Sequence, residues 1–281
     1  MKNSKSIMKT LVSSTFSFLL TLLFFTLFVC IGLSFGIFGN KSIISKINET
    51  KYYDKVYVEL NKRADEIILQ AALPVTVLDD VITLDRVYVG GNNYINGTLK
   101  GEKPQINTDK LRSNLQEHID QYLTQQAIEK TDEVKALEDN VITRIEEEYL
   151  SGVELKFIDY FVDFRTSFGN VMKLIIPLSV VLACVLCVLL IRLHKNRHRG
   201  LRYINYALIS SSLLLIIASF SLLISKGYEK LNVMPAYYRD FLIAYFKWDI
   251  QVFLYIGCIG ILISAALVSL TKFFKDRANK G

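Results

Sequence analysis

Four long stretches without a charged residue constrain the fold of this 281-residue chain more than any other feature. They are the 31 residues between Lys9 and Lys41, the 18 between Lys173 and Arg192, the 23 between Arg202 and Lys226, and the 22 between Asp249 and Lys272. A helix needs about 20 apolar residues to cross a bilayer core, and it satisfies its own backbone hydrogen bonds there. The sequence therefore predicts an all-α membrane protein with four transmembrane helices, at residues 11–36, 172–192, 203–225 and 250–271.

The basic residues are concentrated beside the ends of these predicted helices. Residues 1–10, the stretch "IRLHKNRHRGLR" at 191–202 and the tail 272–281 together carry a net charge of +11, whereas residues 37–170 carry −7. Short segments rich in Lys and Arg remain on the cytoplasmic side of a membrane. The charges therefore predict a multi-pass protein of the cell membrane with both termini in the cytoplasm. The loop residues that determine this orientation are Arg192, Lys195, Arg197, Arg199 and Arg202.

This distribution of charge also indicates which partners to expect. Basic residues beside a membrane are attracted to anionic lipid headgroups, at about 1 kcal/mol for each residue near the surface. We therefore expect the basic loop to contact the lipid bilayer, and we expect no nucleic-acid binding. The remaining segments follow from the spans: a cytoplasmic N-terminus (1–10), an extracytoplasmic helical domain (37–171) inserted between the first and second spans, a cytoplasmic loop (193–202), an external aromatic loop (226–249) and a cytoplasmic tail (272–281).

The first part of the predicted external domain shows a helical repeat. Its apolar residues are spaced alternately by four and three positions, which is typical of a helix with a narrow, coiled-coil-like seam. We expect this helix to continue from the first span and to end before Pro74. The seam residues are Tyr53, Tyr57, Leu60, Ala64, Ile67 and Ala71.

Two more helices are predicted further along the external segment. Thr108 and Thr131 are candidate N-caps, because each precedes a stretch with apolar residues on one helical face. The intervening residues 74–106 are rich in glycine, and they fit either short helices or an excursion made of turns. The external part is therefore expected to be a small helical bundle.

Two groups of residues near the spans are candidates for contact with lipid or protein. The aromatic residues of the last external loop favour a helix at the membrane interface, with a ligand-stacking pocket as the alternative. They are Tyr237, Tyr238, Phe241, Tyr245 and Trp248. Small residues four positions apart allow helix backbones to approach closely, either within this chain or at a partner subunit. They are Gly32, Gly36, Gly260 and Ser264.

Recognisable catalytic chemistry is missing from the sequence. Apart from Lys173 and Arg192 at the two ends of the second span, the predicted spans contain no Asp, Glu, Lys, Arg or His, and the chain lacks Walker A, HExxH, GxSxG and GxGxxG motifs. His194 and His198 are four positions apart, but their loop has no Cys, Asp or Glu to complete a metal site. We therefore predict that the protein is not an enzyme and that it has no catalytic, cofactor-binding or metal-binding residues.

The segment after the first span carries a resemblance. Its sequence, "FGNKSIISKINETKYYDKVYVELNKRADEII", together with the span before it, resembles uncharacterised four-span membrane proteins of low-GC Gram-positive bacteria. In these proteins a first span leads into a Tyr- and Lys-rich external helical segment, which is followed by three clustered spans. The resemblance implies a bacterial source and this layout, and it supplies no activity or site residues.

Two functional hypotheses from different classes follow. In the first, the external helical domain binds a membrane or extracellular protein partner or a ligand, and the protein acts as a sensor, an accessory subunit or an immunity-type factor. In the second, the four spans form a small oligomeric channel or transporter. A stoichiometric partner after mild detergent extraction would favour the first hypothesis, and ion flux through a pure homo-oligomer would favour the second.

Overall fold

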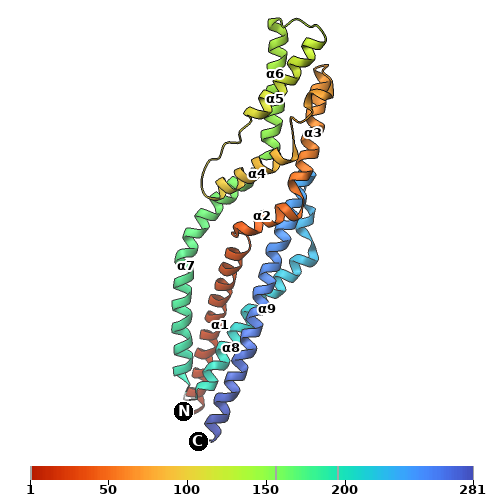
Figure 1. Cartoon of the computed structure of the whole chain (residues 1–281). Helices are drawn as coiled ribbons and strands as arrows, with labels where there is room; N and C mark the ends of the chain where they lie inside the picture. The colour runs from red at the N-terminus through yellow and green to blue at the C-terminus, as the bar shows by residue number, and fades with distance from the viewer. Residues whose placement is uncertain (1, 156, 195, 281) are drawn as a thin grey trace. The chain divides into compact units, whose positions relative to one another are not determined.

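A computed structural model describes residues 2–155, 157–194 and 196–280 of the chain (Figure 1). Over these residues the fold is all-helical and contains no strand, which confirms the all-α part of the predicted fold class. The α-helices are α1 (Lys2–Phe35), α2 (Asn40–Glu49), α3 (Tyr52–Gln70), α4 (Leu84–Leu99), α5 (Asp109–Gln125), α6 (Asp132–Val153), α7 (Phe157–Leu193), α8 (Arg197–Ser225) and α9 (Ala236–Lys280). Short 3-10 helices occupy Val75–Leu78 and Gly227–Lys230.

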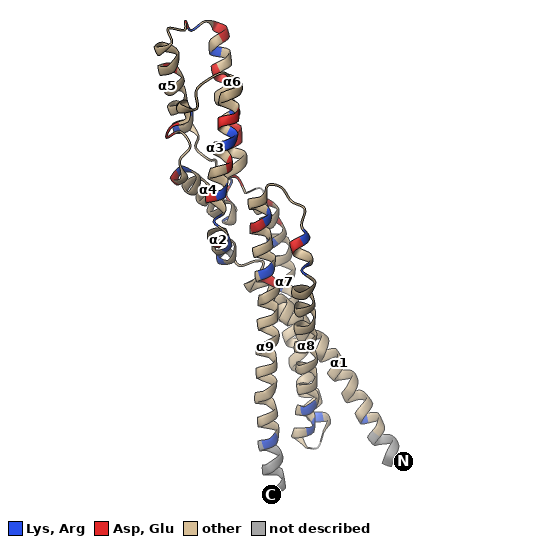
Figure 2. Cartoon of the chain, turned by 90° about the vertical axis from the view of Figure 1, so that its right-hand side faces the viewer, with Lys and Arg blue, Asp and Glu red and all other residues tan. Residues whose placement is uncertain are grey.

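Four of these helices are long and apolar enough to cross a membrane, as predicted. The candidate spans are Ile7–Phe35, Phe157–Leu193, His198–Ser225 and Ala236–Lys272. Only 17% to 33% of the most apolar stretch of each helix is buried by protein, so most of its apolar surface requires another cover, such as lipid. Figure 2 shows that charged residues are rare along α1, α8 and α9 and numerous along α3 and α6.

The chain divides into two compact units, which are described separately here. The first unit comprises Met1–Ile43, Ser167–Val233 and Leu242–Gly281, and the second comprises Ile44–Thr166 and Met234–Phe241. The prediction of a domain formed by the insertion 37–171 alone is therefore not confirmed. The second unit also includes the start of α9, because the rings of Tyr237 and Phe241 pack edge-on against Tyr52 of α3.

The first unit has a core between α1, α7 and α8. Leu20 of α1 is fully buried in a cluster with Leu190 of α7 and Ala207 of α8. The turn from α7 into α8 is tight at Gly200, where a Cβ atom would lie 2.6 Å from the carbonyl oxygen of Leu190. A side chain at this position would collide with the backbone, so the glycine allows the first turn of α8 to lie close to the last turn of α7.

The second unit is a bundle in which α3 packs against α4 and α6, and α5 packs against α6. Its core includes Leu60 of α3, Ile95 of α4, Leu115 of α5, and Ile142 and Ile145 of α6, which are all buried. The buried residues of α3, α5 and α6 repeat at helical spacing, so each of these helices contributes one apolar face to the core.

The helix expected to continue from the first span into residues 53–71 is interrupted, and that prediction is wrong. The interruption separates α1, α2 and α3, and it occurs at two places. Residues 36–39 form turns, and Lys51 adopts a left-handed backbone conformation with φ 50° and ψ 45°. A left-handed residue cannot continue a right-handed helix, so α3 begins in a new direction after Lys51.

Residues 74–106, which the sequence left open, contain α4. Thr83 caps this helix, because its Oγ1 accepts a hydrogen bond from the backbone N–H of Arg86 at 3.3 Å. Gly90 and Gly91 lie within the helix, although glycine disfavours a helix interior by about 1 kcal/mol. Gly91 is required by packing, because a Cβ atom there would lie 2.1 Å from the ring of Tyr53.

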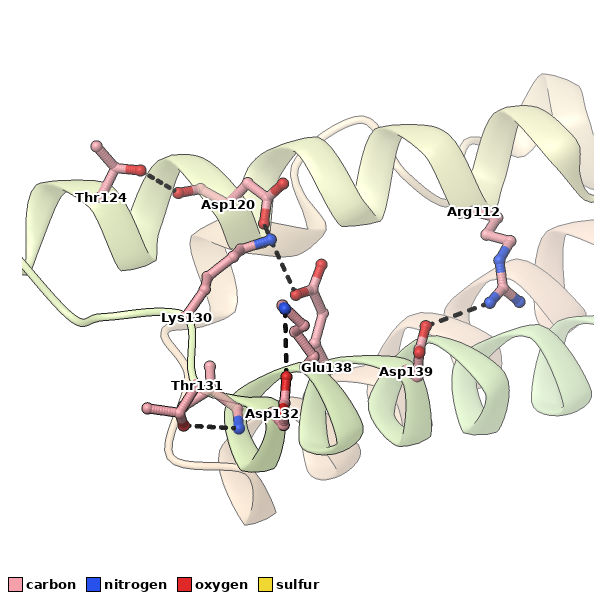
Figure 3. A network of polar contacts seen from close by, with 10 residues as sticks. Arg112, Asp120, Thr124, Lys130, Thr131, Asp132, Glu138 and Asp139 are labelled. Carbon is pink, nitrogen blue, oxygen red and sulfur yellow. Dashed lines mark hydrogen bonds and ion pairs between the residues drawn. The ribbon is translucent and has the colours of Figure 1, made fainter.

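Ion pairs connect the ends of α5 and α6, which are joined by a short turn (Figure 3). Lys130 of this turn pairs with Asp120 of α5 and, at 3.2 Å, with the buried Glu138 of α6. Thr131 is the N-cap of α6, as predicted, and its Oγ1 accepts a hydrogen bond from the backbone N–H of Val134 at 3.4 Å. These contacts stabilise the α5–α6 hairpin, and we assign them no binding role.

Candidate functional site

The principal candidate site is a groove in the second unit, which we call the α3–α9 groove. It lies between the first half of α3 and the beginning of α9, and its volume is about 790 Å³. Its lining includes Lys51, Lys55, Val58, Met234, Tyr237 and Asp240. Because both sides of the groove belong to one compact unit, their spacing is determined by packing within that unit.

Aromatic packing positions the two sides of the groove. Tyr52 of α3 is buried, and its ring centroid lies 5.3 Å from that of Tyr237 and 5.8 Å from that of Phe241, both on α9. Edge-to-face pairs of this kind add about 0.5–1.5 kcal/mol to the burial of their surface. Burial also raises the pKa of the Tyr52 phenol well above its ordinary value. The groove therefore rests on neutral aromatic side chains.

An ion pair connects the same two helices at the rim. The Nζ of Lys55 donates a hydrogen bond to Oδ2 of Asp240 at 2.8 Å, and both side chains are partly exposed. An exposed pair of this kind contributes little to stability, at about 0–1 kcal/mol. It does leave one positive and one negative group at the surface, where a ligand or a partner can reach them.

The exposed apolar residues of the groove distinguish it from an ordinary surface. Val58 of α3 is 65% exposed and Met234, which precedes α9, is 80% exposed. Single exposed apolar residues are common on proteins. In this groove two of them lie in one concave surface with charged residues around them, which is the arrangement of an apolar centre and a polar rim at protein interfaces.

The charges of the groove are balanced. Three lining residues are basic (Lys51, Lys55, Arg63) and three are acidic (Asp54, Glu59, Asp240). Arg63 donates hydrogen bonds to Glu59 and to Glu148 of α6, at 3.2 and 3.1 Å. A balanced surface does not favour a polyanion or a polycation, so this arrangement supports binding of a partner with both charged and apolar groups.

The predicted external seam is part of the core of the second unit. Tyr53, Leu60, Ala64 and Ile67 are buried, whereas Tyr57 and Ala71 are only partly buried. The buried face also includes residues that the sequence pattern did not identify, namely Tyr52, Val56 and Ile68. The seam therefore holds the bundle together, and the groove uses neighbouring positions on α3.

The predicted interfacial aromatics occupy a different position from the one expected. They lie on α9, which continues without a break into the fourth candidate span, so they do not form a separate helix on the bilayer surface. Phe241 and Tyr245 are buried by protein, and the Tyr245 hydroxyl donates a hydrogen bond to the carbonyl oxygen of Ile37 at 2.6 Å. Tyr238 and Trp248 are partly buried. The physical reason is that Phe241 and Tyr245 are covered by other parts of the chain.

The predicted small residues make contacts within this chain. A Cβ atom on Gly32 would lie 2.3 Å from the ring of Phe253, and one on Gly260 would lie 2.2 Å from Oγ of Ser212. The hydroxyl of Ser264 donates a hydrogen bond to Oδ1 of Asn205 at 2.8 Å. These contacts agree with packing inside the chain, and contact with a partner subunit stays a prediction.

The basic loop has a structural histidine but no metal site among the described residues. Nε2 of His194 lies 3.0 Å from Oγ of Ser13, and its ring stacks on Tyr203 with the centroids 5.5 Å apart. Burial, aided by nearby Arg199 and Lys9, lowers the pKa of His194. No group of three or more His, Cys, Asp or Glu residues suited to a metal ion is found in the described part of the chain.

The other predicted residues of the basic loop are exposed where they are described. Arg192, Arg199 and Arg202 have exposed side chains. Lys195 lies outside the described residues, and so does the side chain of Arg197. An exposed basic group is free to contact a lipid headgroup.

One buried acidic residue was missed by the sequence prediction. Asp249 immediately precedes the predicted fourth span, and we therefore treated it as the last charge of an external loop. In the structure it lies within α9 and is only 3% exposed. Neither carboxylate oxygen has a hydrogen-bond partner among the described residues. The signal that could have identified it is an isolated acid at the edge of a 22-residue stretch without charges.

Comparison with known proteins finds no matching family model, no matching curated protein and no matching solved structure. The function is therefore inferred from the α3–α9 groove and from the distribution of apolar and charged residues.

Proposed function

We propose that this chain is a multi-pass protein of the cell membrane whose second unit binds a polypeptide partner outside the cell. In this proposal the protein is not an enzyme and acts as a sensor, an accessory subunit or an immunity-type factor. The observation that carries the proposal is the α3–α9 groove, with its exposed Val58 and Met234 inside a rim of balanced charges. We expect this partner to be either a membrane protein or an extracellular protein.

The chemistry of the groove favours a polypeptide over other partners. Burying an apolar side chain on Val58 and Met234 contributes about 25 cal/mol for each Å² of apolar surface removed from water. The charged rim then selects the orientation and register of a segment that carries both signs of charge. Nucleic acid requires a net positive surface, and this groove has three basic and three acidic residues.

The proposed topology follows from the charge distribution. The short segments beside the spans carry +11 and residues 37–170 carry −7, so we place both termini in the cytoplasm and the second unit outside. Single cysteines at exposed Gln116 and at exposed Asn196 test this in a variant whose four native cysteines are replaced by alanine. An impermeant thiol reagent added to intact cells should label the first position and spare the second. The reverse pattern would refute the topology.

Partner binding is tested by site-specific cross-linking in intact cells. A photo-reactive amino acid is placed at Val58 inside the groove or at Leu69 on the same helix, outside the groove. The two sites are 65% and 63% exposed, so they are matched for access to solvent. We expect a discrete adduct with one polypeptide from Val58 and none from Leu69.

A second variant separates specific binding from chance contact. Met234→Asp places a charge in the apolar part of the groove without disturbing a buried residue, because Met234 is exposed. The adduct from Val58 should then decrease by at least about tenfold, which corresponds to about 1.4 kcal/mol of binding free energy. Equal adducts from both helix positions, or an adduct that is insensitive to Met234→Asp, would refute the proposal.

A further inference from the structure

The buried carboxylate of Asp249 lies in the first unit beside the end of α1. A Cβ atom added to Gly36 would lie 3.0 Å from Oδ1 of Asp249 and 2.9 Å from the carbonyl oxygen of Gly32. The two oxygens therefore both lie close to the Cα of Gly36, where a side chain would collide with them. The absence of a side chain at Gly36 allows the carboxylate of Asp249 to approach the end of α1 this closely.

The surroundings of this carboxylate are unfavourable for an isolated negative charge. The carboxyl-terminal end of a helix carries a partial negative charge, and α1 ends at Phe35 with no basic residue in its last turn. Asp249 forms no ion pair and accepts no hydrogen bond among the described residues. A buried charge without a partner is strongly destabilising, so this carboxylate has to be neutralised, either by a proton or by a bound cation.

The end of α1 also supplies suitable oxygen ligands. The turn that follows it leaves main-chain carbonyl groups close to the end of the helix, and a carbonyl oxygen has two lone pairs. That of Gly32 accepts one hydrogen bond, from the backbone N–H of Gly36 at 2.7 Å, so it retains capacity for a second interaction. Carbonyls at helix ends and at unwound segments, together with a carboxylate, are the usual ligands for alkali cations inside membrane proteins.

We propose that Asp249 and the main-chain oxygens at the end of α1 bind a monovalent metal cation. The single carboxylate matches the charge of one such ion. A divalent ion is less suited, because calcium sites use six to eight oxygens that usually include several carboxylates. No cluster of three or more His, Cys, Asp or Glu residues is present in the described part of the chain. This cation site is independent of the α3–α9 groove and of the proposed polypeptide partner.

The test measures the stability of the full chain in lipid nanodiscs. Thermal unfolding is followed in sodium chloride, potassium chloride and choline chloride at equal ionic strength and constant neutral pH. A ligand that binds only the folded state raises the unfolding temperature as its concentration increases. We expect sodium or potassium to stabilise the protein relative to choline, with saturation as the concentration rises.

Two variants and one control relate this effect to the site. Asp249→Asn preserves the size of the side chain and removes its charge. Gly36→Ala places a methyl group about 3.0 Å from Oδ1 of Asp249 and so displaces the carboxylate from the end of α1. Both should weaken cation binding by at least about tenfold. Asp163→Asn changes an exposed carboxylate on α7, outside both proposed sites, and should leave the cation effect unchanged.

The outcomes distinguish the proposal from its rivals. Stabilisation by an alkali cation that is lost in Asp249→Asn supports the site, even if Gly36→Ala does not fold. An equal response of the wild-type protein and Asp249→Asn overturns it. Stabilisation by mild acid without any difference between sodium, potassium and choline also overturns it, because the carboxyl group would then be neutralised by a proton.

Discussion

Replacing Leu60 with Asp should unfold the second unit, whereas the same replacement at Leu69 should be tolerated. Both residues lie on α3, but Leu60 is 3% exposed and Leu69 is 63% exposed. Leu60 packs directly on the backbone of α6, where a Cβ atom added to Gly152 would lie 2.7 Å from Cδ2 of Leu60. The pair of variants therefore compares one chemical change in two environments.

The expected magnitude follows from this burial. Full burial of a leucine side chain contributes about 1.5–3 kcal/mol, and Leu60→Asp removes that contribution. The new carboxyl group adds the cost of an unpaired polar group, which is about 1–3 kcal/mol even when it takes up a proton. The sum of about 2.5–6 kcal/mol is a large part of the roughly 5–15 kcal/mol that stabilises a typical domain. Leu69→Asp should cost no more than about 1 kcal/mol, including the unfavourable position of a carboxylate near the end of α3.

Limited proteolysis of the full chain in membranes provides the measurement. Leu60→Asp should make residues 44–166 sensitive to protease, and Leu69→Asp should retain the wild-type resistance. Equal resistance of the two variants would refute the packing of α3 on α6. Protease sensitivity of both variants would show that α3 tolerates a new charge on neither of these two faces.

Three further predictions concern the same unit. Gly91→Ala should lower the unfolding temperature, because overpacking against Tyr53 costs about 1–3 kcal/mol and the gain in helix propensity is only about 1 kcal/mol. The control is Gly169→Ala in α7, which has open space around it and should not lower the unfolding temperature. Lys130→Met should increase proteolysis at the α5–α6 turn more than Lys135→Met, because only Lys130 pairs with a buried carboxylate, and equal cleavage would contradict this. Burial raises the pKa of Tyr53, so its contribution to stability is present below the ordinary tyrosine pKa of about 10 and is lost as the pH rises above it. Tyr53→Phe should reduce this alkaline loss in a pH series of thermal melts, and an unchanged loss would show that Tyr53 is not responsible.

Much of the local structure was predictable from the sequence because its causes are local. The four charge-free stretches identified the apolar helices, and Thr131 identified the start of α6. The helix that carries the seam ends at Gln70, before Pro74, as expected from the restriction that proline places on a helix. The break before Lys51 was not predictable, since a left-handed lysine has no distinctive sequence pattern.

The candidate sites were less predictable because they depend on distant segments. α4 was obscured by Gly90 and Gly91, and the need for Gly91 becomes clear only from its contact with the ring of Tyr53. The α3–α9 groove is formed by residues near 55 and near 240, and no local sequence pattern indicates that these two segments lie side by side.

The sequence by itself determined that the chain is helical, that four of its helices are apolar enough for a bilayer, and where the basic charge lies relative to them. These properties follow from hydropathy and charge along the chain, which require no knowledge of contacts. Only the tertiary structure decided which aromatic residues of α9 are covered by protein, and that Asp249 is buried beside the end of α1. The physical reason is that burial depends on what packs against a residue, and those partners lie up to about 200 positions away in the chain, as for Tyr245 and Ile37, which are separated by 208.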